Sequence, residues 1–259
     1  DYTIPELTSL HNFKADAADF PIVPTLFITI ACGAISGFHA TQSPLMARCL
    51  TDQKQCRPVF FGAMISESLI ALIWAAIAMA FFGGVEALGA ALAEHGNNAS
   101  WAVKLIADTT LGRGGGILAV LGVIAAPITS GDTAFRSARL IVADFLHIEQ
   151  KSLLKRLLIS IPLFVVGFII TLVDFDVVWR YFAWFNQTLA VFTLWAVTTY
   201  LVGRKKNYWV SLIPAAVMTF VCGTYLFLGK EMFHLDHTLS YVLGSAITVI
   251  ALTTFISSK

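Results

Sequence analysis

Three polar runs inside otherwise apolar stretches hold the residues whose types and spacing could bind a ligand. In the first run, Gly33, Ser36 and Gly37 interrupt an apolar stretch, and His39 follows. Irregular backbone inside a membrane is tolerated where it lines a cavity or is buried in protein. Such a break would offer carbonyl groups to a cation and, at the start of the next half-helix, N–H groups to a carboxylate. The alternative is a glycine notch that packs against a neighbouring helix.

The second polar run supplies neutral oxygen atoms. Thr129 and Ser130 stand beside Pro127 and Gly131, which we expect to loosen the helix. Freed carbonyl and hydroxyl oxygens suit a hard cation. These two residues are therefore candidate ligands of Na⁺.

Three titratable side chains in the apolar stretches are candidates for carrying a coupling proton, namely Glu67, Asp132 and His39. Each has a structural alternative. Asp132 precedes Arg136 by four residues, so the two could neutralise each other on one helix face. Glu67 could pair with Arg136 or Arg139, and His39 could hold a substrate carboxylate or donate to a neighbouring carbonyl.

The third polar run places Asn186 and Gln187 between aromatic residues in mid-span. They either line a substrate path or join helices by hydrogen bonds. The sequence has no GxSxG, HExxH, Walker A or GxGxxG motif, and His39 is the one histidine of six inside a predicted span. We therefore expect no enzyme activity, and no cofactor apart from Na⁺ as a candidate ion.

Composition says what kind of elements must position these residues. The chain has 259 residues, of which 57% are hydrophobic and 13% charged, a net charge of +1 and a mean hydropathy of +0.77. So few charges cannot cover a water-soluble surface, and the neutral balance gives no basic surface for nucleic acid. The sequence indicates an all-α integral membrane protein whose main partner is the lipid bilayer.

Seven apolar runs are each long enough to cross a hydrocarbon layer of about 30 Å. They cover approximately 22–47, 57–83, 115–140, 155–173, 177–202, 208–228 and 238–258. Twelve of the 17 Lys and Arg residues lie in the loops 48–57, 136–156 and 204–206 or at Lys259. Positive-inside bias then places the start of the chain outside and the C-terminus in the cytoplasm.

Further segments complete the predicted organisation. Residues 1–20 form an outer lead-in without a signal peptide, and residues 85–111 form two short helices over the outer face. Because the chain begins outside and without Met, we expect it to be the C-terminal part of a longer protein.

Three long motifs resemble the carbon starvation protein A (CstA) family. They are FITIACGAISGFH at 27–39, TSGDTAFRSAR at 129–139 and WRYFAWFNQTLA at 179–190. The resemblance covers nearly the whole chain and is loosest at the ends. The chain departs from better-studied members at 40–49, which would face the site.

The resemblance implies an inner-membrane transporter that takes up pyruvate or peptides during carbon starvation. It also implies a LeuT-like fold of the amino acid–polyamine–organocation superfamily. Residues 21–203 would form the second five-helix inverted repeat, whose first helix is broken, and residues 204–259 would form two accessory spans. The Ala-x-x-Thr-Ser pattern of sodium-coupled carriers of this fold falls on Ala126, Thr129 and Ser130. The other broken helix would lie in the missing N-terminal part.

These inferences lead to a secondary transporter that moves a small carboxylate or peptide by alternating access, coupled to H⁺ or Na⁺. The substrate-binding candidates are Gly33, Ser36, Gly37, His39, Asn186 and Gln187. The runner-up hypothesis is a membrane sensor or scaffold that keeps the transporter fold without flux.

Overall fold

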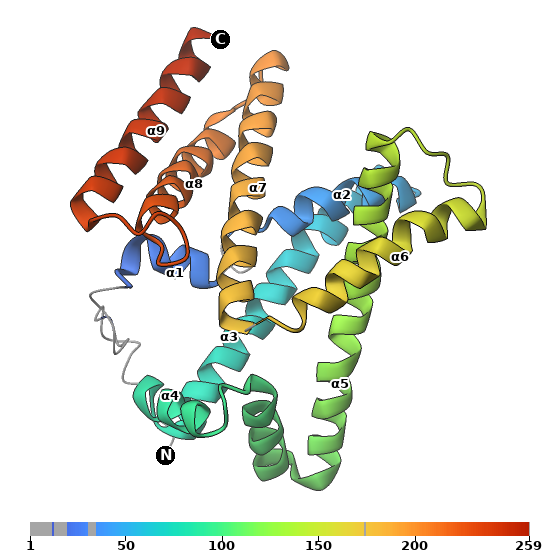
Figure 1. Ribbon diagram of the computed structural model, residues 1–259, viewed down its shortest axis with the longest axis vertical. Helices are drawn as coiled ribbons and strands as arrows, with labels where there is room; N and C mark the ends of the chain where they lie inside the picture. The colour runs from blue at the N-terminus through green and yellow to red at the C-terminus, as the bar shows by residue number, and fades with distance from the viewer. Residues whose placement is uncertain (1–11, 13–19, 31–34, 174, 259) are drawn as a thin grey trace. The chain divides into compact units, whose positions relative to one another are not determined.

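The computed structural model describes residues 12, 20–30, 35–173 and 175–258. Within that part of the chain every regular element is a helix (Figure 1), as the long apolar runs predict. The chain divides into two compact units. The first comprises residues 1–15 and 51–165, and the second comprises residues 16–50 and 166–259.

The second unit is built around a central helix. Its elements are α1 (Ile22–Ile30), α2 (Gly37–Cys49), α7 (Phe175–Gly203), α8 (Trp209–Leu228) and α9 (His237–Ser257). α8 contacts both α7 and α9, and its most apolar window is 56% buried, against 11% in α9. α1 packs on α7 and α8, and α2 packs on α7 (Figure 1). The two halves of the predicted first span therefore share α7 as a neighbour.

Small residues allow α8 and α9 to approach each other closely. A Cβ built on Gly244 of α9 would lie 2.1 Å from the Thr224 hydroxyl and 3.0 Å from the Thr224 Cα of α8. A Cβ built on Gly223 of α8 would lie 3.5 Å from the Gly244 Cα of α9. Helices in membranes commonly associate through such small residues, because the backbones can then make extensive van der Waals contact.

The first unit is a chain of long, largely exposed helices. It contains η3 (Gln53–Gln55), the π-helical turn η4 (Arg57–Gly62), α3 (Ala63–Phe82), α4 (Val85–Glu94), α5 (Ala99–Phe145) and most of α6 (Leu153–Ile170). In the most apolar windows of α3, α5 and α6, only 0%, 6% and 6% of residues are buried. Apolar helices with so little internal packing suit a lipid or protein environment rather than water.

Five helices in the described residues are long and apolar enough to cross a membrane. They are 53–82, 99–145, 153–170, 209–228 and 237–257, so the chain is a multi-pass membrane protein. The predicted count of seven is not reached, for two reasons. The first predicted span is divided into α1 and α2, and α7 carries the polar residues Arg180, Asn186 and Gln187.

The connection between α3 and α5 is helical, as its spacing predicts. α4 ends at Glu94, and Asn98 caps α5 by accepting a hydrogen bond from the Trp101 N–H, at 3.2 Å. The His95 ring stacks on Trp101 with 3.7 Å between centroids. α5 then turns at Gly112, whose φ of 68° lies in the region that glycine adopts easily. The position of these helices over an outer face stays a prediction.

Candidate functional site

The predicted break in the first span is present. α1 ends at Ile30 and α2 begins at Gly37, while Gly33 lies outside the described residues. Ser36 occupies the N-cap position of α2 in an extended conformation, but its side chain makes no cap hydrogen bond. The Ser36 hydroxyl oxygen is buried without a hydrogen-bond partner in the described part of the chain. The break thus leaves a buried hydroxyl at the start of the second half-helix.

Asn186 and Gln187 contact the two sides of this break. The Phe38 N–H of α2 donates to Asn186 Oδ1 at 2.8 Å, and Gln187 Nε2 donates to the Phe27 carbonyl of α1 at 3.2 Å. Asn186 is 7% exposed and Gln187 is 0% exposed. Both residues therefore lie at the break. Their hydrogen bonds join helices, which is the second of the two roles that the sequence suggests for them.

Gly37 is a packing notch. A Cβ built there would lie 2.2 Å from the Asn186 carbonyl oxygen, 2.8 Å from the Leu189 Cβ and 3.1 Å from the Ala190 nitrogen. Only glycine allows the start of α2 to approach the α7 backbone so closely. This contact agrees with the interpretation of Gly37 as a packing notch. The notch and the break occur at the same place in the chain.

Tryptophan side chains extend the polar connections of α7 to α8. Trp184 Nε1 donates to the Cys222 carbonyl at 3.1 Å, and Trp195 Nε1 donates to Thr219 Oγ1 at 3.0 Å. Ile28 of α1 is buried in the same core, at 2% exposure. α7 is consequently tied to α1, α2 and α8 by buried or half-buried contacts.

His39 lies in the first turn of α2 and is half-buried. Its ring meets the edge of the Phe38 ring with 6.4 Å between centroids. Of the predicted substrate-binding residues, Gly37 and Asn186 meet where α2 contacts α7, and Gln187 bonds α1. Ser36 and His39 lie close to this contact along the chain.

The second polar run belongs to the first unit. Thr129 Oγ1 donates to the Ala126 carbonyl at 2.9 Å, and Thr133 Oγ1 donates to the Thr129 carbonyl at 2.8 Å. α5 stays helical through Pro127, since Gly112 is the residue at which its backbone departs from helical angles. Local hydroxyl–carbonyl bonds therefore join the candidate sodium ligands Ala126 and Thr129, and Ser130 is exposed beside them.

The expected ion pair on α5 is present. Arg136 Nη2 lies 2.7 Å from Asp132 Oδ2, and both side chains are more than half exposed. Glu67 is exposed on α3 of the same unit. The sequence suggests two roles for Asp132, a proton carrier or the partner of Arg136, and this ion pair corresponds to the second.

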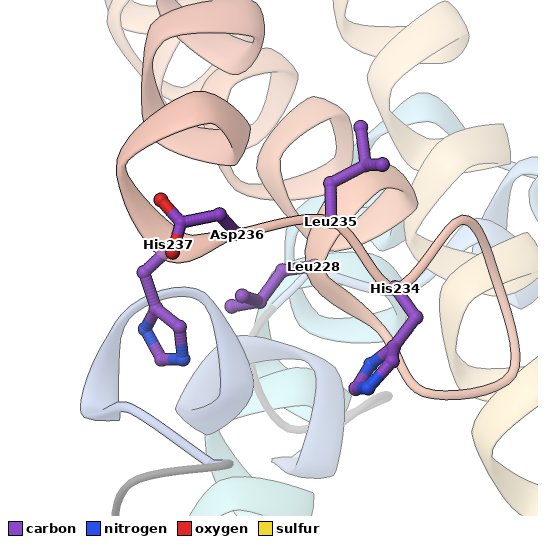
Figure 2. A pocket seen from close by; sticks show the side chains of 5 residues that line it. All are labelled: Leu228, His234, Leu235, Asp236 and His237. Carbon is purple, nitrogen blue, oxygen red and sulfur yellow. The ribbon is translucent and has the colours of Figure 1, made fainter.

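A pocket of about 250 Å³ lies at the loop between α8 and α9, where no site is expected from the sequence. It is lined by Leu228, His234, Leu235, Asp236 and His237. In Figure 2 both imidazole rings project to the same side of this loop, with Leu228 between them. The spacing of His234 and His237 is visible in the sequence, but it lies outside the apolar runs. Among described residues, no group of three His, Cys, Asp or Glu side chains is arranged to hold a metal ion.

The same loop is tied to the start of α7. Arg180 Nε lies 2.5 Å from Glu231 Oε1, with side chains 31% and 15% exposed. The Tyr181 hydroxyl donates to the Glu231 carbonyl at 2.7 Å. Nothing local in the sequence pairs Arg180 with Glu231, because they lie far apart in the chain.

Comparisons with known proteins agree with the motifs. The family model described as carbon starvation protein CstA matches residues 1–116. An uncharacterized protein of Haemophilus influenzae is 52% identical over 122 residues, which cover 46% of this chain and 88% of that relative. The peptide transporter CstA of Escherichia coli K12 is 26% identical over 282 residues, covering 83% of this chain and 40% of the transporter.

A third relative has a different named substrate. The pyruvate/proton symporter BtsT of Escherichia coli K12 is 45% identical over 53 residues, or 20% of this chain and 7% of the symporter. The chain therefore spans less than half the length of the two named transporters. No solved structure matches.

Proposed function

This chain belongs to the carbon starvation protein CstA family, and from that premise we propose that it forms part of a secondary active transporter. The transported substrate would be a small carboxylate such as pyruvate, or a peptide. The relatives named as a peptide transporter and a pyruvate/proton symporter support a transporter as the class of protein. The two named substrates share a carboxylate group, which is the chemistry that the proposed site has to bind.

The observation that carries the proposal is the interrupted span packed on α7. Transporters commonly bind their substrate where a membrane helix is discontinuous, since the free N–H groups of a half-helix attract a carboxylate. In this chain residues 35 and 36, directly before Gly37, lie outside any helix. The interruption faces a helix with two buried amide side chains at mid-length, Asn186 and Gln187.

The proposed carboxylate site is the start of α2. The Phe38 N–H already bonds Asn186, so we assign substrate binding to the buried Ser36 hydroxyl and to His39 in the same turn. Gly33 and Gly37 would complete the site, and the α7 amides would hold the two half-helices beside it. A hydroxyl and an imidazole can both donate to a carboxylate oxygen.

The coupling ion would be H⁺ or Na⁺. Ala126, Thr129 and Ser130 supply oxygen atoms for Na⁺, whereas Glu67, Asp132 and His39 are titratable. The resemblance of the third span to sodium-coupled carriers favours Na⁺, and the relative named as a proton symporter favours H⁺.

The proposed setting is the inner membrane, with the start of the chain outside and the C-terminus in the cytoplasm. In this arrangement residues 21–203 would act as one LeuT-like repeat, and α8 with α9 would be accessory. A further helical part of the same protein would then complete the site, because a midplane site of this kind forms between two repeats.

The experiment is gradient-driven uptake by the complete gene product that carries this chain. The purified protein is reconstituted in liposomes, and labelled pyruvate and a labelled dipeptide are supplied under an imposed H⁺ or Na⁺ gradient. We expect uptake of one of these substrates above that of protein-free liposomes. Uptake of neither substrate under either gradient would refute the proposed substrate class.

A further inference from the structure

We propose that Asn186 and Gln187 are positioning residues that together clamp the two halves of the interrupted span at a fixed separation. The hydrogen bonds are observed, and their consequence for transport rests on the proposed function. Neither amide is assigned to the substrate itself. Their task is to hold the helix ends between which the substrate would bind.

The two bonds go to groups of opposite kind, one to an N–H group and one to a carbonyl. The first four N–H groups of a helix lack intrahelical acceptors. Phe38 is the second residue of α2, and its N–H donates to Asn186 Oδ1. Phe27 lies in the last described turn of α1, and its carbonyl accepts from Gln187 Nε2. Asn186 therefore supplies the acceptor that the start of α2 lacks, and Gln187 ties the last described turn of α1 to the same helix.

Asn186 performs the capping that Ser36 does not. Serine at an N-cap usually accepts a hydrogen bond from the second or third N–H of its helix. The Ser36 side chain makes no such bond, and the acceptor comes instead from α7, 148 positions along the chain. A cap supplied by another helix ties the position of α2 to α7, which a cap from within α2 would not do.

Burial makes both bonds costly to lose. Gln187 is 0% exposed and Asn186 is 7% exposed, so water cannot replace either bond. A buried donor or acceptor left unpaired costs more free energy than the bond itself contributes. Because the two amides are consecutive residues, one helix of fixed geometry holds both ends at once.

The Gly37 notch makes the arrangement possible. The start of α2 lies so close to α7 that a Cβ on Gly37 would be 2.2 Å from the Asn186 carbonyl oxygen. Asn186 therefore meets α2 through its backbone and its side chain together. The clamp consists of Asn186, Gln187 and this contact.

The test measures the separation of α1 and α2 directly. Spin labels are placed at Leu26 and Met46, which are both 47% exposed, in a variant that lacks the cysteines at 32, 49 and 56. Pulsed electron paramagnetic resonance on the reconstituted complete protein gives the distance distribution. We expect Asn186→Leu and Gln187→Leu each to shift its maximum by about 2 Å or to broaden it clearly.

Two further variants separate the clamp from general packing. Asn186→Asp keeps an acceptor oxygen and should preserve the wild-type distribution, whereas Asn186→Ser is too short to reach Phe38 and should not. Thr193→Val is the matched control on the same helix, since its hydroxyl bonds only within α7 in the described contacts. If a leucine variant does not fold, the aspartate and serine variants decide the matter.

Transport kinetics test whether the clamp affects substrate binding. A positioning role predicts that Asn186→Ser raises KM for the transported substrate at least tenfold with a smaller change in kcat, and that Asn186→Asp restores KM. Distance distributions unchanged in both Asn186→Ser and Gln187→Leu would overturn the clamp. The distance measurement does not depend on transport. A wild-type protein that moves no substrate would refute the proposed function, and the distance distributions would still test the clamp.

Discussion

The amide N–H of Phe38, in the first turn of α2, donates a 2.8 Å hydrogen bond to the side-chain carbonyl of Asn186 in the middle of α7. This bond connects the second half of an interrupted span to a continuous helix. It accounts for a polar residue at mid-span that lipid could not satisfy. The interruption is therefore a supported element of the fold.

Gly37 is expected to tolerate no side chain. Gly37→Ala would place a methyl group 2.2 Å from the Asn186 carbonyl oxygen, so α2 must move away from α7. Overpacking of this kind costs about 1–3 kcal/mol. Thermal unfolding in detergent should show a lower midpoint. Gly122→Ala is the control, because no heavy atom outside its own helix backbone lies within 4 Å of its hypothetical Cβ; an equal loss in both variants would contradict the notch.

The contact of α8 with α9 should depend on one glycine more than on its neighbour. Gly244→Ala would bring a methyl group within 2.1 Å of the Thr224 hydroxyl, whereas Gly223→Ala meets its nearest atom at an ordinary 3.5 Å. We expect Gly244→Ala to destabilise the second unit by about 1–3 kcal/mol and Gly223→Ala to be near neutral. Proteolysis of the α8–α9 loop measures the difference. The reverse order of sensitivity would show that the helices pack differently.

The ion pair between Arg180 and Glu231 should be coupled more strongly than the pair on α5. Arg180 and Glu231 are 31% and 15% exposed, whereas Arg136 and Asp132 are 56% and 66% exposed. A double-mutant cycle with glutamine at both positions should give a coupling energy of about 1–2 kcal/mol for Arg180–Glu231. The α5 pair should give about 0.5 kcal/mol or less. Equal coupling energies would contradict the greater burial of the Arg180–Glu231 pair.

The candidate sodium ligands can be tested against a neighbour on the same helix face. Thr129→Val combined with Ser130→Ala removes both hydroxyls, so we expect lower uptake and the loss of any dependence on sodium. Thr133→Val is the control, because its hydroxyl donates to the Thr129 carbonyl within the helix. The measurement is uptake under a sodium gradient alone and under a pH gradient alone. Wild-type uptake that ignores sodium would rule out the sodium site and favour Glu67 or His39.

Hydropathy predicts the ends of the last two helices closely, because a long apolar run with polar flanks marks a membrane span directly. The predicted span 208–228 corresponds to α8 at Trp209–Leu228, and 238–258 corresponds to α9 at His237–Ser257. The break before Gly37 is also predictable, since glycines followed by polar residues do not suit a lipid-facing helix. The bend of α5 at Gly112 falls between the predicted end of the outer helices at 111 and the predicted start of the next span at 115. The glycine-rich run 112–116 does not show which of its residues leaves the helical conformation.

Partners far apart in the sequence were not predictable. Nothing local indicates that Asn186 reaches Phe38 or that Gln187 reaches Phe27, because the pairing depends on the packing of α7 against both half-helices. The sequence left two interpretations of the amides open, and the hydrogen bonds correspond to one of them. The loop pocket with His234 and His237 was missed because it forms only where α8 and α9 meet.

The most direct test of a transporter is whether substrate crosses the membrane against its own gradient. The complete gene product is reconstituted in liposomes, and the internal concentration of labelled substrate is followed while an ion gradient is imposed and then collapsed with an ionophore. We predict that the label rises above its external concentration and leaves when the gradient collapses. Label that never exceeds about one molecule per protein and does not respond to the ionophore would contradict active transport, and would identify a sensor that binds without flux.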